Sequence, residues 1–199
     1  MGKFLSDVAF AALLGFLTNN ILLVYGVGTG LALKLSRRDS SALLYGLVML
    51  ITTVLGVSGT YFIDRRILND YNMQFLRPLI YIAAIAVLLG IVEALILRFG
   101  EKYGEKFKKI MQMGILNSAT LGILLIGQNQ RLSNFGEALL FAIFATFGYI
   151  ATIGVLSCLR ERIELSNPPD FMRGIPIILV TLGLLALAFM GFTGLSLPY

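Results

Sequence analysis

The sequence contains no histidine, one cysteine and few charged residues. Without histidine, the chain lacks the commonest general base and the commonest haem ligand. Because Cys158 stands alone, the chain can form no internal disulfide, and its thiolates alone cannot hold a zinc ion or an iron–sulfur cluster. The sequence also shows no phosphate-binding loop, metal-ligand cluster or nucleophile arrangement. It therefore predicts no catalytic residue of the kind found in soluble enzymes.

Apolar residues, in contrast, are abundant: they make up 57% of the 199 residues, whereas 14% are charged. A soluble domain of this length would need far more polar surface, so the composition indicates an integral membrane protein. A membrane-spanning helix needs about 20 mostly apolar residues. Six stretches qualify, namely residues 4–25, 41–63, 79–97, 110–126, 137–159 and 175–197. We therefore predict an all-α fold with six transmembrane helices in a single membrane domain, residues 1–199.

The basic residues between these stretches predict an orientation. With six spans, 11 of the 16 Lys and Arg residues fall on one side of the membrane and five on the other. Cytoplasmic loops carry the excess of basic residues, so we predict that both termini lie outside the cytoplasm. Residues flanking the spans also explain the net charge of +5, which therefore does not indicate nucleic-acid binding.

A weak internal repeat relates the two halves of the chain. The segment "RRILNDYNMQFLRPLI" aligns with "ERIELSNPPDFMRGIP" at an offset of 96 residues, pairing Phe75 with Phe171 and Arg77 with Arg173. The same offset brings the first span over the fourth, so each half, about 1–100 and 101–199, holds three spans. An odd number of spans inverts the second half relative to the first, as in transporters that bind their substrates between repeats.

Polar residues interrupt the first and fourth spans at corresponding depths. Asn19 and Asn20 lie in the first span, Asn117 and Ser118 lie in the fourth, and glycines follow both pairs. Such spans can break into half-helices whose free backbone groups are satisfied by protein. Two interpretations remain open: the asparagines form a binding site near the membrane midplane, or they bridge helices that the glycines allow to pack closely.

Glu93 lies inside the third span, where an ionisable residue suggests a function by default. It could contribute to a proton or sodium pathway. It could equally form an interior ion pair, or lie near the membrane edge beside Arg98.

Several motifs together resemble those of a known family. They are "NNILLV" (19–24), "FID" (62–64), "FLR" (75–77), "RERIELSNPPDFMRG" (160–174) and "LALAFMGFTGL" (185–195). The chain thereby resembles, over nearly its whole length, the paired, homologous membrane subunits of Rnf and Nqr electron-transport complexes, especially the branch containing RnfA and NqrE. The position of Glu93 is also a glutamate in that family. The predicted orientation agrees with this branch, whose sister subunit is thought to lie the other way up.

The resemblance implies a cofactor that this sequence is not equipped to hold. In the family, two cysteines from each of two sister subunits are understood to bind one [2Fe–2S] cluster at the membrane midplane. Those cysteines fall on Gly30 and Ser118 here. Glycine offers no ligand, a serine oxygen replaces a soft thiolate poorly at iron, and a sister subunit would leave the cluster two ligands short of four. Cys158, beside Arg160 at the end of the fifth span, cannot compensate. We therefore expect the cluster to be absent or incomplete.

The resemblance also implies a function, partners and a location. The chain would be a non-catalytic membrane subunit of an Rnf- or Nqr-type ion-translocating oxidoreductase, supporting electron transfer coupled to Na⁺ or H⁺ transport. It would pair with a homologous six-helix sister subunit, similar to RnfE or NqrD, and with other redox subunits in a prokaryotic cytoplasmic (inner) membrane. The missing cysteines favour an alternative, a cofactor-free scaffold or small transporter built on the same inverted repeat.

Overall fold

The computed structural model describes residues 12–36, 42–70, 73–99, 117–129, 134–166 and 168–192. Within these ranges all regular structure is helical, which confirms the predicted all-α class. Four long helices form the frame: α3 (Ala42–Ile63), α4 (Arg77–Phe99), α7 (Phe135–Leu165) and α8 (Ile175–Met190). The shorter elements are η1 (Leu13–Thr18), α2 (Thr29–Leu35), η2 (Asp64–Leu68), η3 (Gln74–Leu76), α6 (Ser118–Asn129) and η5 (Asp170–Met172).

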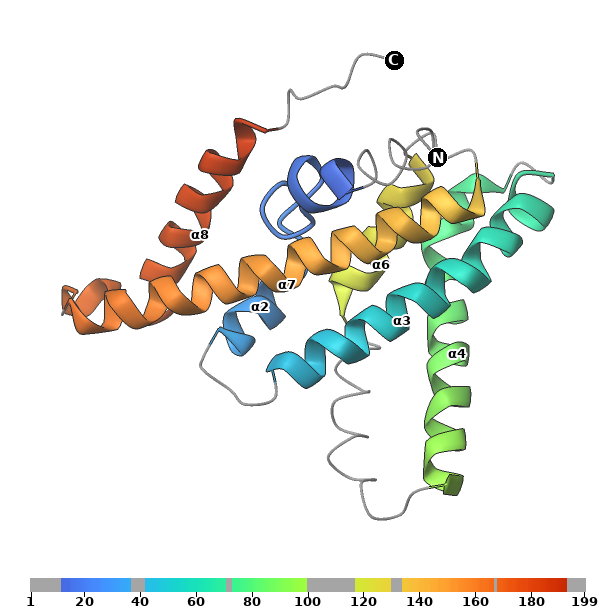
Figure 1. Ribbon diagram of the computed structural model, residues 1–199, viewed down its shortest axis with the longest axis horizontal. Helices are drawn as coiled ribbons and strands as arrows, with labels where there is room; N and C mark the ends of the chain where they lie inside the picture. Colours follow the sequence, from blue (N-terminus) through green and yellow to red (C-terminus); the bar gives the residue numbers. More distant parts are fainter. Residues whose placement is uncertain are drawn as a thin grey trace, which may run out of the picture.

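Helix α7 is central, and it packs against α3, α6, α2, α8 and η1 (Figure 1). Its sequence is free of charge and proline from residue 138 to residue 159. Glu137 lies in its first turn and Arg162 in its last, where each charge interacts favourably with the helix dipole. At about 1.5 Å per residue, its 31 residues extend about 46 Å, which exceeds the ~30 Å of a bilayer's hydrocarbon core. The ends of α7 can therefore reach the headgroup region.

The first predicted span is not a continuous helix. The π-helical segment η1 ends at Thr18, residues 19–28 form turns, and α2 begins at Thr29. Gly26 and Gly28 have positive φ angles of 65° and 83°, a backbone conformation that glycine adopts without steric cost. The asparagines and glycines of this span thus lie at a break in the helix. Residues 4–11 of this span lie outside the described residues.

The other predicted spans correspond to helices whose ends differ by a few residues. Spans 41–63 and 137–159 match α3 and α7, which overlap the two helical stretches of the described chain that are long and apolar enough to cross a membrane. Span 79–97 lies within α4, and span 175–197 begins with α8. Only the second part of span 110–126 is described, as the first turns of α6. The number of membrane crossings and their orientation remain predictions.

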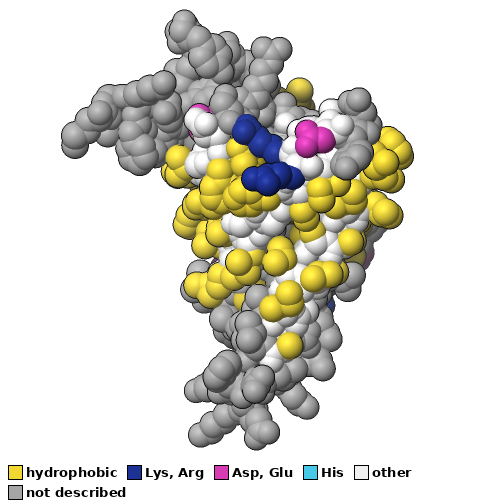
Figure 2. Space-filling model, turned by 90° about the vertical axis from the view of Figure 1, so that its right-hand side faces the viewer, with side chains coloured by type: hydrophobic (Ala, Val, Ile, Leu, Met, Phe, Trp, Pro, Cys, Tyr) yellow, Lys and Arg dark blue, Asp and Glu magenta, His cyan; other side chains and the backbone are white. Residues whose placement is uncertain are grey.

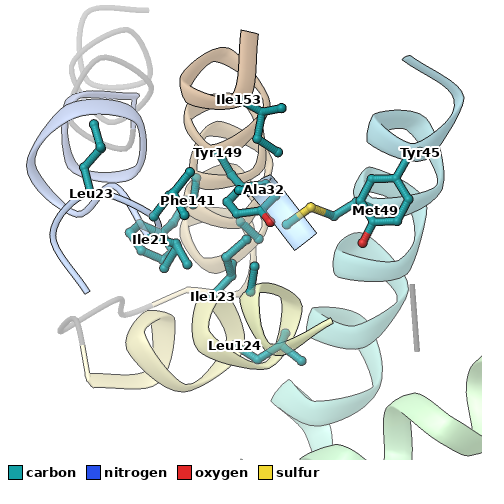
Figure 3. Close-up of a cluster of buried hydrophobic side chains, with 14 of the residues drawn as sticks. Ile21, Leu23, Ala32, Tyr45, Met49, Ile123, Leu124, Phe141, Tyr149 and Ile153 are labelled. Carbon is teal, nitrogen blue, oxygen red and sulfur yellow. The ribbon is translucent and has the colours of Figure 1, made fainter. Parts of the chain in front are cut away.

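The helices enclose a buried apolar cluster at the centre of the bundle (Figure 3). Met49 of α3, Ile123 of α6 and Phe141 of α7 are each at most 1% exposed, and Ile21 joins them from the broken part of the first span. The break is therefore part of the core, and its polar backbone needs partners inside the protein.

The outer surface is also apolar. Leu79 of α4 and Leu187 of α8 are 68% and 65% exposed, and many other large apolar side chains of these two helices are exposed. On the face drawn in Figure 2, hydrophobic side chains form a broad band with basic and acidic side chains at one edge. This distribution is the one expected for a protein surrounded by lipid.

Two short 3₁₀ helices support the predicted repeat. η3 and η5 each contain three residues, and both their first and last residues are 96 positions apart. Each of them leads into a long apolar helix, α4 or α8. The offset found by aligning the two sequence segments thus also relates local structure in the two halves.

Candidate functional site

The break in the first span is held in place by the side chain of Asn20, which is 1% exposed. Its Oδ1 accepts hydrogen bonds from the backbone N–H groups of Leu22 (3.1 Å) and Leu23 (3.2 Å). Its Nδ2 donates to Thr152 Oγ1 (2.9 Å) and to the carbonyl oxygen of Gly148 (3.2 Å), both in α7. Asn20 therefore satisfies backbone groups that an interrupted helix would otherwise leave unpaired in hydrocarbon.

Two glycines bring the backbones of η1 and α7 together. A Cβ atom on Gly148 would lie 2.9 Å from the carbonyl oxygen of Phe16, and one on Gly15 would lie 2.8 Å from that of Phe141. Small residues allow this close approach of helices. The short separation lets Asn20 reach across to α7.

The end of the break is clamped at Gly28. Its N–H donates to Ser118 Oγ (3.1 Å), at the start of α6. Its carbonyl oxygen accepts from the hydroxyl of Tyr149 (2.9 Å), a fully buried residue of α7. A Cβ atom on Gly28 would lie 2.7 Å from the Cβ of Ala119, so the close contact itself requires glycine. The broken span of the first half thus contacts the first turn of α6 in the second half.

Asn117 organises that first turn of α6. Its Oδ1 accepts a hydrogen bond from the N–H of Ala119 (3.0 Å), the arrangement of a helix N-cap. Its Nδ2 lies 3.5 Å from the sulfur of Met49 in α3, and the side chain is buried. Asn117, like Asn20, therefore satisfies local backbone and also contacts a neighbouring helix.

Two further hydroxyl groups lie near Asn117, one three residues along the chain and one on the facing helix α3. Tyr45 lies one turn before Met49 on α3 (Figure 3), and Thr120 lies in the first turn of α6. Both hydroxyls are buried, and neither has a hydrogen-bond partner in the structure as described. Unpaired buried hydroxyls are uncommon. The polar groups around α6 are therefore less completely satisfied than those around Asn20.

The two positions that correspond to the family's cluster cysteines, Gly30 and Ser118, are both exposed. Gly30 lies in the first turn of α2, two residues beyond Gly28, and thus within about 7 Å of the residue that binds Ser118. No atom lies within 4 Å of the place that a Cβ on Gly30 would occupy. Gly30 offers no donor atom, and the Ser118 oxygen already accepts a hydrogen bond. These residues do not fit an iron–sulfur cluster.

Cys158 does not supply the missing thiolate. It is exposed on α7, nine residues beyond Tyr149, which places it about 13 Å along the helix from the residue that contacts Gly28. Within the described ranges, no group of three or more His, Cys, Asp or Glu residues is placed to hold a metal ion.

Of the remaining candidate residues, Asn19 lies apart from this arrangement. Asn19 accepts a hydrogen bond from the hydroxyl of Tyr25 (2.9 Å) at the exposed side of the break. Glu93 lies in α4, but its side chain is outside the described part of the chain. The structure therefore brings together Asn20, Gly28, Asn117 and Ser118, and it leaves Asn19 outside the buried network.

Two residues that hold the break, Tyr149 and Thr152, were not identified from the sequence. Together with Thr146, they form a series of polar residues spaced by three in an otherwise apolar span, and all three are buried. That spacing places them on one helix face. A search for polar residues at helical spacing would have identified this face of α7.

Comparisons with known proteins match nearly the whole chain. A family model described as "Rnf-Nqr subunit, membrane protein" matches residues 9–196. The chain is 32% identical over 179 residues to a subunit of the ion-translocating oxidoreductase complex of Syntrophotalea carbinolica, covering 90% of this chain and 92% of the relative. It is 30% identical over 189 residues to a subunit of the Na⁺-translocating ferredoxin:NAD⁺ oxidoreductase complex of Acetobacterium woodii, covering 94% and 97%.

Proposed function

This chain belongs to the Rnf-Nqr family of membrane subunits, and we propose that it is a subunit of an ion-translocating oxidoreductase complex. In that role it supports transmembrane electron transfer that is coupled to the transport of Na⁺ or H⁺. The names of its relatives, which include a Na⁺-translocating ferredoxin:NAD⁺ oxidoreductase subunit, support this function.

One structural observation carries the proposal: the broken first span is clamped against the start of α6 through Gly28 and Ser118 (3.1 Å). In membrane proteins, irregular backbone at membrane depth occurs where it is buried in protein or lines a site. Inverted repeats place such sites between their halves. We propose that the six predicted spans form two inverted repeats with both termini outside the cytoplasm, in a prokaryotic cytoplasmic (inner) membrane.

The partner that we propose is a homologous six-helix sister subunit. Gly30 and Ser118 are exposed although they adjoin the buried network, and much of the apolar surface of α4 and α8 has no protein cover among the described residues. A sister subunit of the RnfE or NqrD type that packs against the break would enclose both positions. Electron passage at this contact would not use a [2Fe–2S] cluster bound by four thiolates, because this chain provides none there.

The experiment that tests this function is purification of the chain from its native membrane in a mild detergent. We expect a homologous six-span protein and further redox subunits to co-purify in equal amounts. We also expect membranes without this chain to lose the ion uptake that accompanies electron transfer. A stable, monodisperse monomer, together with unchanged ion uptake in the membranes that lack it, would overturn the proposal.

The missing thiolates keep one alternative open, a cofactor-free scaffold or small transporter on the same fold. The same purification and ion-uptake measurement distinguish this alternative from a subunit that supports electron transfer. A scaffold would co-purify with its sister subunit, but its removal would leave redox-driven ion uptake intact in any complex that still assembles.

A further inference from the structure

A cavity of about 290 Å³, lined by charged and apolar residues, lies where α7 ends and α8 begins. The residues that line it include Arg160 and Glu164 of α7, Arg173 from the connection, and Ile177 and Ile178 of α8. Its volume approaches that of small-ligand pockets, which start near about 300 Å³.

The position of Arg160 along α7 sets the depth of this cavity in the membrane. The uncharged residues 138–159 extend about 33 Å, close to the ~30 Å thickness of the hydrocarbon core. Arg160 is the first charged residue after them and begins the charged end of the helix. The cavity therefore lies at the level of the lipid headgroups.

The repeat places a second arginine at this corner of the second half. In the first half, Arg77 binds Asp64 through two hydrogen bonds (2.6 and 3.1 Å), and Asp64 is only 2% exposed. At the repeat offset of 96, Asp64 corresponds to Arg160 and Arg77 to Arg173. The second half thus has an arginine at the position where the first half has the buried acid of an ion pair.

Acidic residues only partly balance these two arginines. Arg160 Nε pairs with Glu164 (2.9 Å) and Arg173 Nη1 with Asp170 (3.1 Å), but the two acidic side chains are 66% and 91% exposed. The pair of Arg173 with Asp170 is exposed on both sides and is therefore weak. The contacts that both guanidinium groups make with described residues use their Nε and Nη1 atoms, so N–H donors remain for an anion.

Arg160 is also rigidly held. Its Nη1 donates to the carbonyl oxygen of Leu33 (3.3 Å) and to Ser36 Oγ (3.2 Å) at the end of α2. These contacts keep the guanidinium group in place before any ligand arrives, which reduces the entropy lost on binding.

A second, apolar cavity lies further along the same two helices. Helix α8 leaves the end of α7 at a wide angle, with η1 between them further along (Figure 1). This cavity, of about 130 Å³, lies there between Val155 of α7 and Leu185 and Phe189 of α8. It lies about two turns along α7 from Arg160, on the side of the hydrocarbon core.

We propose that the corner between α7 and α8 binds an anionic phospholipid. Arg160 and Arg173 hold the phosphate in the larger cavity, and an acyl chain runs along α7 and α8 toward the apolar cavity beside Val155. The two arginines, the depth of the corner and the apolar cavity beyond it favour a lipid over a soluble phosphate.

Native mass spectrometry of the full chain in detergent tests this proposal by titration with phosphatidylglycerol or phosphatidylcholine. We expect phosphatidylglycerol to bind more tightly, and Arg173→Gln to weaken it by about fivefold, the effect of one basic residue at a membrane surface. Glu164→Gln removes a competing carboxylate and should strengthen the binding. Arg162→Gln is the matched control: Arg162 is exposed and close in sequence, but it does not line the cavity.

Glycerol phosphate and the variant Val155→Phe test the acyl chain. Val155→Phe fills the apolar cavity and should weaken phosphatidylglycerol, while the water-soluble glycerol phosphate should bind far more weakly than the lipid to every variant. Equal affinity for the two lipids, or an equal loss from Arg162→Gln, would overturn the proposal. Glycerol phosphate that binds as tightly as phosphatidylglycerol would show a simple anion site instead and would also overturn it.

Discussion

Gly28 combines two demands that only glycine meets. Its φ of 83° lies in the left-handed region, and an added Cβ would lie 2.7 Å from the Cβ of Ala119 and 2.9 Å from the ring of Tyr149. Of two nearby glycines, Gly26 lacks one of these features and Gly30 lacks both. Gly26 has a φ of 65° but open space around it, and Gly30 lies in helix α2 with open space. These three positions separate backbone strain from steric contact.

We predict a graded loss of stability for alanine at these glycines. Gly26→Ala should cost about 1 to 2 kcal/mol from the left-handed backbone alone. Gly28→Ala should cost about 3 kcal/mol, because overpacking adds to that strain. Gly30→Ala should cost nothing, since alanine favours a helix. Thermal unfolding of the purified variants in detergent measures the series, and equal effects at Gly28 and Gly30 would contradict the clamp.

The asparagine pair shows what a sequence can say about single residues. The polar interruption at Asn19 and Asn20 was predictable, because amides are rare in apolar spans. Which of the two is buried was not, since it depends on how η1 turns before the break. Asn20 faces α7 and bonds to Gly148 and Thr152, more than 120 residues away, whereas Asn19 bonds to nearby Tyr25. Of the two interpretations given for the asparagines, these contacts support helix bridging for Asn20.

The ion pair between Asp64 and Arg77 joins η2 to the start of α4. We predict that Asp64→Asn destabilises the protein by about 2 kcal/mol, since Arg77 loses a carboxylate that is only 2% exposed. The loss should stay below the ~3–5 kcal/mol of fully buried pairs because the Arg77 side chain is 19% exposed. Thermal unfolding measures this too. Asp170→Asn, which breaks the exposed pair with Arg173, is the control and should change little.

Long helices were easier to predict than the broken span. Helices α3, α4, α7 and α8 follow apolar runs that charged, proline or polar residues delimit, so their starts lie within two residues of the predictions. The broken span is different, because its turns, its π-helical segment and short α2 depend on partners in α6 and α7. Hydrophobicity alone cannot reveal such distant partners, so residues 4–25 read as one span.

Cysteines at Gly30 and Ser118 test the relation between the broken span and α6. The prediction is that the unmodified chain, alone or with its partner, shows no absorption or EPR signal of a [2Fe–2S] cluster from this site. Gly30→Cys combined with Ser118→Cys should create iron binding in the presence of a sister subunit that provides two more thiolates. Open space at Gly30 accommodates the new side chain.

The single variants are the controls for this experiment. Either cysteine alone leaves the coordination incomplete, so neither should bind iron stoichiometrically. Stoichiometric iron and labile sulfide at this site in the unmodified protein would contradict the prediction, and would mean that Ser118 or another residue coordinates the metal.

The whole molecule presents apolar side chains outward as well as inward. The exposed faces of α4 and α8, together with the band in Figure 2, fit a protein surrounded by lipid and by a partner. The composition predicted this environment, because so few charged residues cannot cover a soluble surface. It could not predict which apolar faces meet lipid and which meet another protein, since both kinds of face have the same composition.

Orientation in the membrane is the last property that the distribution of charge predicts. The end of α7 that carries Arg160 and Arg162 belongs to the side with 11 of the 16 basic residues. Cytoplasmic loops carry that excess, so this end, and the anion-binding corner beside it, should face the cytoplasm.

Reporter fusions after Lys34, Lys106 and Asn167 should then be cytoplasmic and a fusion after Tyr199 external. Of these four sites, only Lys34 lies within the described residues. Helix α8 follows the cytoplasmic end of α7 and is the last predicted span, so Tyr199 should lie outside. A cytoplasmic fusion at Tyr199 would mean that the predicted number of spans is wrong by an odd number. It would also remove the agreement with the branch that contains RnfA.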